Sequence, residues 1–140
     1  MPRAVLDSTV LVSGVITPKC VAAEILDRAV RGAFDLYLSE ALIEETRGVL
    51  LERKHLRKRF RYSDQEVEEF CLLLRIFART FAELPSVRVS RDPADDMVVA
   101  SALKAKAQYL VTRDKDLLSI SHEGIRILGP EDSMALLRKG

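Results

Sequence analysis

Acidic residues in the second half of the chain stand where two elements are expected to begin or end. Asp92, followed by proline, has the residue type of a helix N-cap. Asp95 then shares one helix face with apolar residues at i+3, i+4 and i+7, so its carboxylate is expected to face the core. Asp114 and Asp116 directly follow a short apolar run typical of a buried strand. This spacing suggests a shared carboxylate pocket.

Two acids far away in the sequence interrupt apolar patterns in the same way. Asp7 lies inside the run V-L-D-S-T-V-L-V, where an unpaired charge would be costly to bury. Glu45 lies in the middle of the apolar stripe of a helix that Ser39 is expected to cap, whereas Glu40 and Glu44 lie to its side. Both acids therefore join the candidates for the pocket.

Each of these acids also has an ordinary structural explanation, which the sequence leaves open. Asp7 could be satisfied by nearby backbone amides, and Glu45 could lie at the edge of its stripe and pair with an arginine. Acids at helix starts and after strands are favoured by unsatisfied amides, the helix dipole and turn chemistry alone.

The elements that must position these acids alternate between strands and helices. This order predicts a single α/β domain over residues 1–140, with a mostly parallel sheet of about five strands and helices on both faces. In such sheets ligands bind beyond the carboxyl ends of the strands, where several of the acids are expected. Strands are expected at 3–6, 34–38, 87–89, 109–111 and 125–128, and helices begin near 17–18, 39, 63, 92 and 129–130.

Composition places the chain among soluble globular proteins, with 48% hydrophobic and 31% charged residues. A net charge of +1 indicates neither nucleic acid nor membrane as a partner, so electrostatic attraction must come from local patches. Cys20 and Cys71 show no metal or redox spacing, and packing in a reducing cytoplasm is expected. No signal peptide and no apolar run of the ~20 residues that span a membrane is evident, so a cytoplasmic location is expected.

One strongly basic segment stands out in this nearly neutral chain. It carries six Lys or Arg and ends in two aromatic residues, a composition that could follow a phosphate backbone and offer a stacking ring. A solvated connector or frayed helix end explains it equally well. The candidate RNA-binding residues are Arg53, Lys54, Arg57, Lys58, Arg59 and Arg61.

Several carboxylates in one pocket repel one another unless a cation is bound. Oxygen ligands without a His or Cys cluster favour Mg²⁺ or Mn²⁺ over zinc, and such ions can activate water for attack on a phosphodiester. No phosphate-binding glycine loop and no nucleophilic serine motif is evident.

Four segments, in this order, resemble the PIN-domain ribonucleases, most closely the VapC-like branch of prokaryotic toxin–antitoxin systems. They are V-L-D-S-T-V-L-V-S-G, S-E-A-L-I-E-E-T-R-G-V-L, R-D-P-A-D-D-M-V-V-A-S-A-L and Y-L-V-T-R-D-K-D-L-L, and the resemblance covers essentially the whole chain. It implies Mg²⁺- or Mn²⁺-dependent cleavage of RNA in the cytoplasm, frequent homodimers and an antitoxin protein that blocks the site.

The resemblance also assigns roles to residues. It places the catalytic, metal-binding acids at Asp7, Glu45, Asp95 and Asp114, with Asp116 as an additional or substitute ligand. Ser8, Thr9 and Thr112 correspond to hydroxyl residues beside the metal site. Many members have Thr and then Asn after the first Asp, where this chain has Ser and Thr, which affects the surroundings of the ligands more than the ligands themselves.

The leading hypothesis is therefore a metal-dependent endoribonuclease, and two rivals come from other classes. A PIN-like module that binds RNA or protein without turnover is disfavoured because all four acids are present. A small phosphatase or receiver-like domain would need an Asp nucleophile in a D-x-D context or a Lys partner near Asp7, and the segment V-L-D-S-T-V offers neither clearly. An RNA-processing nuclease outside any toxin–antitoxin pair also remains open.

Overall fold

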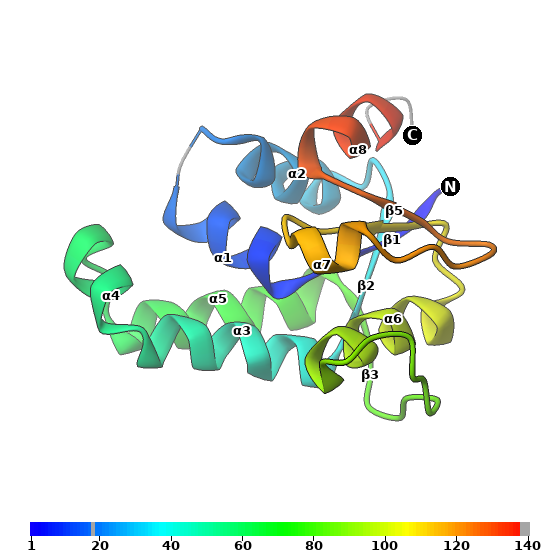
Figure 1. Ribbon diagram of the computed structural model, residues 1–140. Coiled ribbons are helices and arrows are strands. Elements are labelled where there is room, and N and C mark those ends of the chain that lie inside the picture. The colour runs from blue at the N-terminus through cyan, green and yellow to red at the C-terminus, as the bar shows by residue number, and fades with distance from the viewer. Residues whose placement is uncertain (18, 138–140) are drawn as a thin grey trace.

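The computed structural model, which describes residues 1–17 and 19–137, has a five-stranded parallel sheet at its centre (Figure 1). The strand order is β3-β2-β1-β4-β5, which confirms the predicted α/β class and parallel sheet. In chain order the elements are β1 (Arg3–Leu6), α1 (Ser8–Ile16), α2 (Val21–Val30), β2 (Asp35–Ser39), α3 (Glu40–Glu52), α4 (Lys54–Phe60), α5 (Asp64–Phe77), β3 (Arg79–Phe81), α6 (Pro93–Ala105), β4 (Tyr109–Val111), α7 (Lys115–Leu118), β5 (Arg126–Leu128) and α8 (Pro130–Leu137).

Helices cover both faces of the sheet, and β2 shows which helices lie on which face. Its Leu36 lines an apolar hollow together with residues of α2 and α5, whereas its Ser39 points to the other face and hydrogen-bonds Ser101 of α6 at 2.7 Å. Alternation along a strand puts neighbouring side chains on opposite faces. The buried Ser39–Ser101 bond therefore fixes α6, and the acids at its start, against the end of β2.

Local capping chemistry sets most helix boundaries where the sequence predicted them. The Ser39 hydroxyl accepts the Leu42 amide at the start of α3, and Ser63 forms a capping box at the start of α5. Asp92 caps α6. Gly32 follows α2 with φ of 81°, a left-handed conformation that glycine adopts without steric cost.

The structure differs from the prediction around the first two helices. The strand ends at Leu6 as expected, and it is followed by α1, a helix of nine residues that is not among the expected elements. The Cys20 thiol accepts the Ala23 amide, so α2 starts at Val21, later than the predicted 17–18. Pro18 lies outside the described residues.

The strand predicted at 87–89 is wrong. The strand next to β2 is instead β3, which pairs with it at residues 79–81, where the sequence indicated no strand. The amides of Val89 and Ser90 instead donate to one carboxylate oxygen of Asp96, each at 2.8 Å. An amide held by a side chain is not available to a neighbouring strand.

Among the described residues, no single helix is long and apolar enough to cross a membrane, and the one pair that qualifies together, α1 with α2, is bent by 96°.

Candidate active site

Asp7 is buried where β1 ends and α1 begins, with 2% of its surface exposed. One carboxylate oxygen accepts the Thr9 hydroxyl at 2.5 Å and the Val10 amide at 3.3 Å, and the other accepts the Thr112 hydroxyl at 2.6 Å. Burial raises the pKa of Asp7, and these hydrogen bonds partly oppose the rise because they favour the ionised form. Asp7 therefore also has the ordinary structural role of a hydrogen-bonded N-cap of α1.

The two threonines tie Asp7 to the loop that follows β4. The Thr9 hydroxyl accepts the Arg113 amide, and the Thr112 hydroxyl accepts the Asp114 amide, each at 3.0 Å. Each hydroxyl thus donates to Asp7 and accepts from the loop. This arrangement holds the ends of neighbouring strands β1 and β4 in register and places Asp114 on the same edge of the sheet as Asp7.

Asp95 and Asp96 are neighbours on α6 with different environments, as helix phase predicted. Asp96 is engaged by the loop amides of Val89 and Ser90, whereas Asp95 is 6% exposed and accepts the Ser90 hydroxyl at 3.3 Å. Burial, followed by repulsion from Asp114 and other acids, raises the pKa of Asp95. Of the two acids, Asp95 is therefore the more buried, and it interacts electrostatically with Asp114, Asp92 and Asp116.

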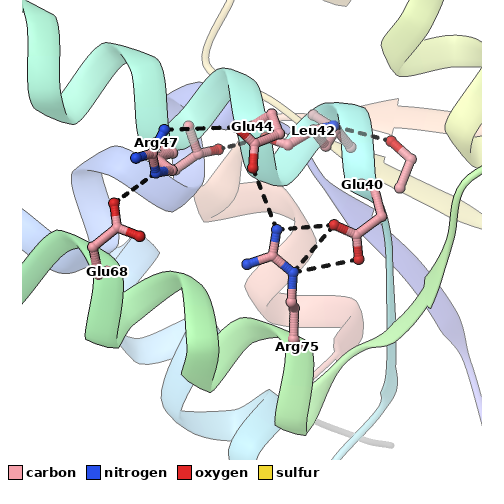
Figure 2. Close-up of polar contacts among 8 residues, drawn as sticks. Glu40, Leu42, Glu44, Arg47, Glu68 and Arg75 are labelled. Carbon is pink, nitrogen blue, oxygen red and sulfur yellow. Dashed lines mark hydrogen bonds and ion pairs between the residues drawn. The ribbon is translucent and has the colours of Figure 1, made fainter.

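Glu45 is half-buried on α3, and the arginines near it bind its neighbours. Arg75 contacts Glu40 at 2.9 Å and Glu44 at 3.4 Å, and Arg47 bridges Glu44 and Glu68 (Figure 2). Among the described ion pairs none involves Glu45, which disfavours its explanation as the partner of an arginine.

The pKa of Glu45 is affected by several of the other acids. Burial raises it most, the Ser8 hydroxyl lowers it, and repulsion from Asp7, Asp92 and Asp95 raises it further. Asp7 and Asp95, which are 88 residues apart in the sequence, therefore both lie close enough to affect the Glu45 carboxylate. Ser8 contacts Glu45, while Thr9 and Thr112 contact Asp7, so all three predicted hydroxyl residues touch candidate acids.

Three further acids complete the surroundings. Asp114 is half-buried and caps α7 by accepting the Asp116 amide at 2.9 Å, and Asp116 is exposed. Both raise the pKa of Asp95. The sequence indicated Asp92 only as a helix cap, yet its charge acts on both Glu45 and Asp95. The D-P-x-D spacing, which puts two acids on the first helical turn, is the signal that could have identified Asp92.

The described residues contain no group of three or more Asp, Glu, His or Cys side chains close enough to form a ready-made metal site. Donor chemistry and charge nevertheless fit a hard divalent cation. The candidate donors are carboxylate oxygens from four segments, and within the described chain Asp7, Glu45 and Asp95 form no ion pair with Lys or Arg. The acids thus fit Mg²⁺ or Mn²⁺ by donor chemistry and charge, without a preformed coordination geometry.

The predicted RNA-binding segment forms α4, which lies at the opposite end of α3 from α6 (Figure 1). Its Arg57 is used internally: it pairs with Asp64, donates to the Leu51 carbonyl and lies over the Tyr62 ring. Tyr62 is also engaged, since its hydroxyl donates to the Leu50 carbonyl at 2.5 Å. The five other candidate cations, of which Arg59 lies over the Phe60 ring, are exposed: Arg53, Lys54, Lys58, Arg59 and Arg61.

Comparison with known proteins tests the resemblance to the PIN-domain family. The family profile described as PIN domain matches residues 3–116 of the sequence, most of the chain. This chain belongs to the PIN domain family. PIN domains are generally nucleases and generally use divalent metals.

The fold is also similar to the crystal structure of PAE2754 from Pyrobaculum aerophilum. The TM-score is 0.67 at 15% sequence identity, over 99% of this chain and 91% of that chain. At this identity the likeness shows the fold alone. No curated protein matches the sequence significantly.

Proposed function

We propose that this PIN domain is a Mg²⁺- or Mn²⁺-dependent endoribonuclease that hydrolyses RNA phosphodiester bonds. The observation that carries the proposal is the mutual repulsion among acids from separate segments, which lack basic partners in the described structure. By contrast, Glu40 and Glu44 on the same helix as Glu45 form ion pairs with Arg75. Carboxylates that raise one another's pKa without such partners mark a functional site.

The proposed metal ligands are Asp7, Glu45, Asp95 and Asp114, with Asp116 assisting. A bound divalent ion would lower the pKa of a water molecule and stabilise charge on the phosphate. The Thr9 and Thr112 hydroxyls orient the Asp7 carboxylate and favour its ionised form, against the effect of burial on its pKa.

Glu45 has a distinct position among these acids. Its raised pKa makes it a stronger base than an ordinary carboxylate, so it is suited to accept a proton beside the substrate. The Ser8 hydroxyl limits this rise in pKa.

The exposed cations of α4 are proposed to bind the RNA backbone away from the cut. Arg53, Lys54, Lys58, Arg59 and Arg61 provide five positive charges at the end of α3 that is opposite α6 (Figure 1). Phosphate contacts of this kind position nucleic acid without reading its sequence. Their loss should weaken RNA binding and its dependence on salt, and should leave the acids intact.

Cleavage of labelled single-stranded RNA with Mn²⁺ or Mg²⁺, with and without chelator, tests the proposal. Glu45→Gln is compared with Glu44→Gln, its exposed neighbour on the same helix. We expect metal-dependent cleavage that falls at least about a hundredfold in Glu45→Gln and less than twofold in Glu44→Gln. Equal activity of the two variants would contradict the assignment, and RNA binding without cleavage by the wild type would favour a binding module.

We further propose that the protein is the toxin of a toxin–antitoxin pair in the cytoplasm, as the VapC-like motifs imply. Expression of the wild type and of Asp95→Asn in a bacterial host tests this role. Growth arrest by the wild type alone, relieved by a small protein encoded just upstream, is the expected result. RNA cleavage in vitro without growth arrest would indicate an RNA-processing nuclease instead.

A further inference from the structure

A second hollow, of about 350 Å³, lies at the end of the sheet opposite the acids. Strand β1 separates Arg3 from Asp7 by four residues, or about 13 Å at the usual rise of ~3.3 Å per residue. The hollow is thus distinct from the candidate active site. Its lining comes from β1, β2, β3 and the end of α6: Arg3, Tyr37, Arg79, Thr80, Phe81, Lys104, Ala105 and Lys106.

Both arginines of the hollow, Arg3 and Arg79, form cation–π contacts with the ring of Tyr37. The guanidinium carbons of Arg3 and Arg79 lie 5.6 Å and 5.8 Å from its centre. They come from β1 and β3, which flank β2 on its two sides. Cation–π contacts of this kind order both guanidinium groups while their N–H groups remain available, and both arginines are exposed.

The charge of the hollow is not neutralised by the chain. Within the described residues, Arg3, Arg79, Lys104 and Lys106 form no ion pair with a carboxylate. One guanidinium nitrogen of Arg3 donates to the Ala105 carbonyl at 3.5 Å, which positions the arginine without compensating its charge.

Two acids lie in the vicinity of the hollow. Asp35 on β2 is paired with Arg3 on β1 in the strand register, and Glu83 lines an adjoining hollow together with Lys104 and Lys106. Among the described ion pairs, neither acid is bound to any of the four cations. Four cations gathered in this way repel one another unless an anion is bound.

We propose that this hollow binds phosphate groups. Guanidinium forks match phosphate oxygens with two parallel hydrogen bonds, and lysine ammonium groups add charge without fixed geometry. The arginines on Tyr37 provide the forks, Lys104 of α6 and Lys106 at its C-cap line the same hollow, and Thr80 adds a hydroxyl. The phosphates come either from a free polyphosphate group, as in a nucleotide, or from the backbone of an RNA; both present the same oxygens.

Calorimetric titration with pyrophosphate, and separately with a short single-stranded RNA, tests the proposal. Both titrations use the full chain in chelator, which removes any divalent-ion bridge to the acids. The double variant Arg3→Gln/Arg79→Gln is compared with Arg31→Gln/Arg47→Gln, which has the same net charge and removes arginines outside the hollow. We expect at least about tenfold weaker pyrophosphate binding in the first and less than twofold change in the second.

Substitution of Tyr37 tests whether the ring positions the arginines, because it changes the ring without changing the charge of the hollow. Tyr37→Phe keeps the ring and should bind as the wild type does, whereas Tyr37→Leu should bind about threefold more weakly or worse. If the double variant does not fold, Lys104→Gln at the exposed end of α6 provides the charge test, with the same expected direction.

The two ligands distinguish the source of the phosphates. Binding of pyrophosphate alone assigns the hollow to free polyphosphate groups, and loss of RNA affinity in Arg3→Gln/Arg79→Gln assigns it to RNA. The proposal is overturned if the wild type does not bind pyrophosphate at millimolar concentration, or if both double variants lose affinity equally. Because the proposal does not depend on the acids, absence of RNA cleavage leaves it standing.

Discussion

Thr112 offers a sharp test of how the candidate site is held together. Its buried hydroxyl donates to Asp7 at 2.6 Å and accepts the Asp114 amide at 3.0 Å. Thr112→Val keeps the shape and removes both bonds. Hydrogen bonds to charged groups contribute about 1.5–3 kcal/mol and neutral ones about 1, so we expect about 2–4 kcal/mol of lost stability. Thr112→Ser keeps the hydroxyl and loses one methyl group, worth about 1 kcal/mol.

Urea denaturation of the two variants at neutral and acid pH measures this difference. The Thr112 hydroxyl lowers the pKa of Asp7, so its removal raises that pKa and destabilises the ionised carboxylate. The cost of Thr112→Val is therefore largest where Asp7 is ionised and shrinks as pH falls through the pKa of Asp7. A valine variant as stable as the serine variant, or a cost independent of pH, would refute the reasoning.

Four further outcomes are expected. Glu45→Gln should increase the free energy of unfolding at neutral pH by about 0.5–1 kcal/mol, because it removes a half-buried charge that other acids repel. Glu44→Gln loses only exposed ion pairs, so it should lower the free energy of unfolding by no more than about 0.5 kcal/mol. The pKa values of Asp7, Glu45 and Asp95 are raised in the folded state, chiefly by burial, so the unfolded chain loses these protons at lower pH than the folded chain does. Wild-type stability should therefore fall as pH rises from the ordinary values near 4 through the raised ones, and a flat profile in urea denaturation would contradict this. Asp96→Ala should cost about 1–3 kcal/mol because two loop amides lose their acceptor, measured by thermal unfolding. Leu72 and Ile76 are 59% and 63% exposed on α5, so if the expected homodimer uses this face, Leu72→Glu with Ile76→Glu should yield monomers in sedimentation without loss of stability.

Local patterns in the sequence predicted most elements and the orientation of the key acids. Helix phase separated Asp95 from Asp96 and Glu45 from Glu44, and the structure places the first of each pair on the more buried side. Capping residues such as Ser39 indicated helix starts, because a cap is satisfied within a few residues of sequence.

Side chains that bind nearby loop amides, and features that depend on distant segments, could not be predicted in this way. The loop before α6 is shaped by the Asp96 carboxylate, which takes the amides that a strand at 87–89 would need. The charge of Asp92 acts on Glu45 across 47 residues of sequence, and the arginines on Tyr37 come from two separate strands. No periodicity in the chain encodes such contacts; they arise from the strand order.

Binding of Mn²⁺ to the purified protein, followed by electron paramagnetic resonance at neutral pH, tests the central claim most directly. Asp95→Asn and Asp96→Asn make a matched pair, since each removes one carboxylate from adjacent positions of α6. The account predicts that the wild type and Asp96→Asn bind the ion, whereas Asp95→Asn binds it at least about tenfold more weakly. A wild type that binds no Mn²⁺ at millimolar concentration, or equal binding by the two variants, would contradict it.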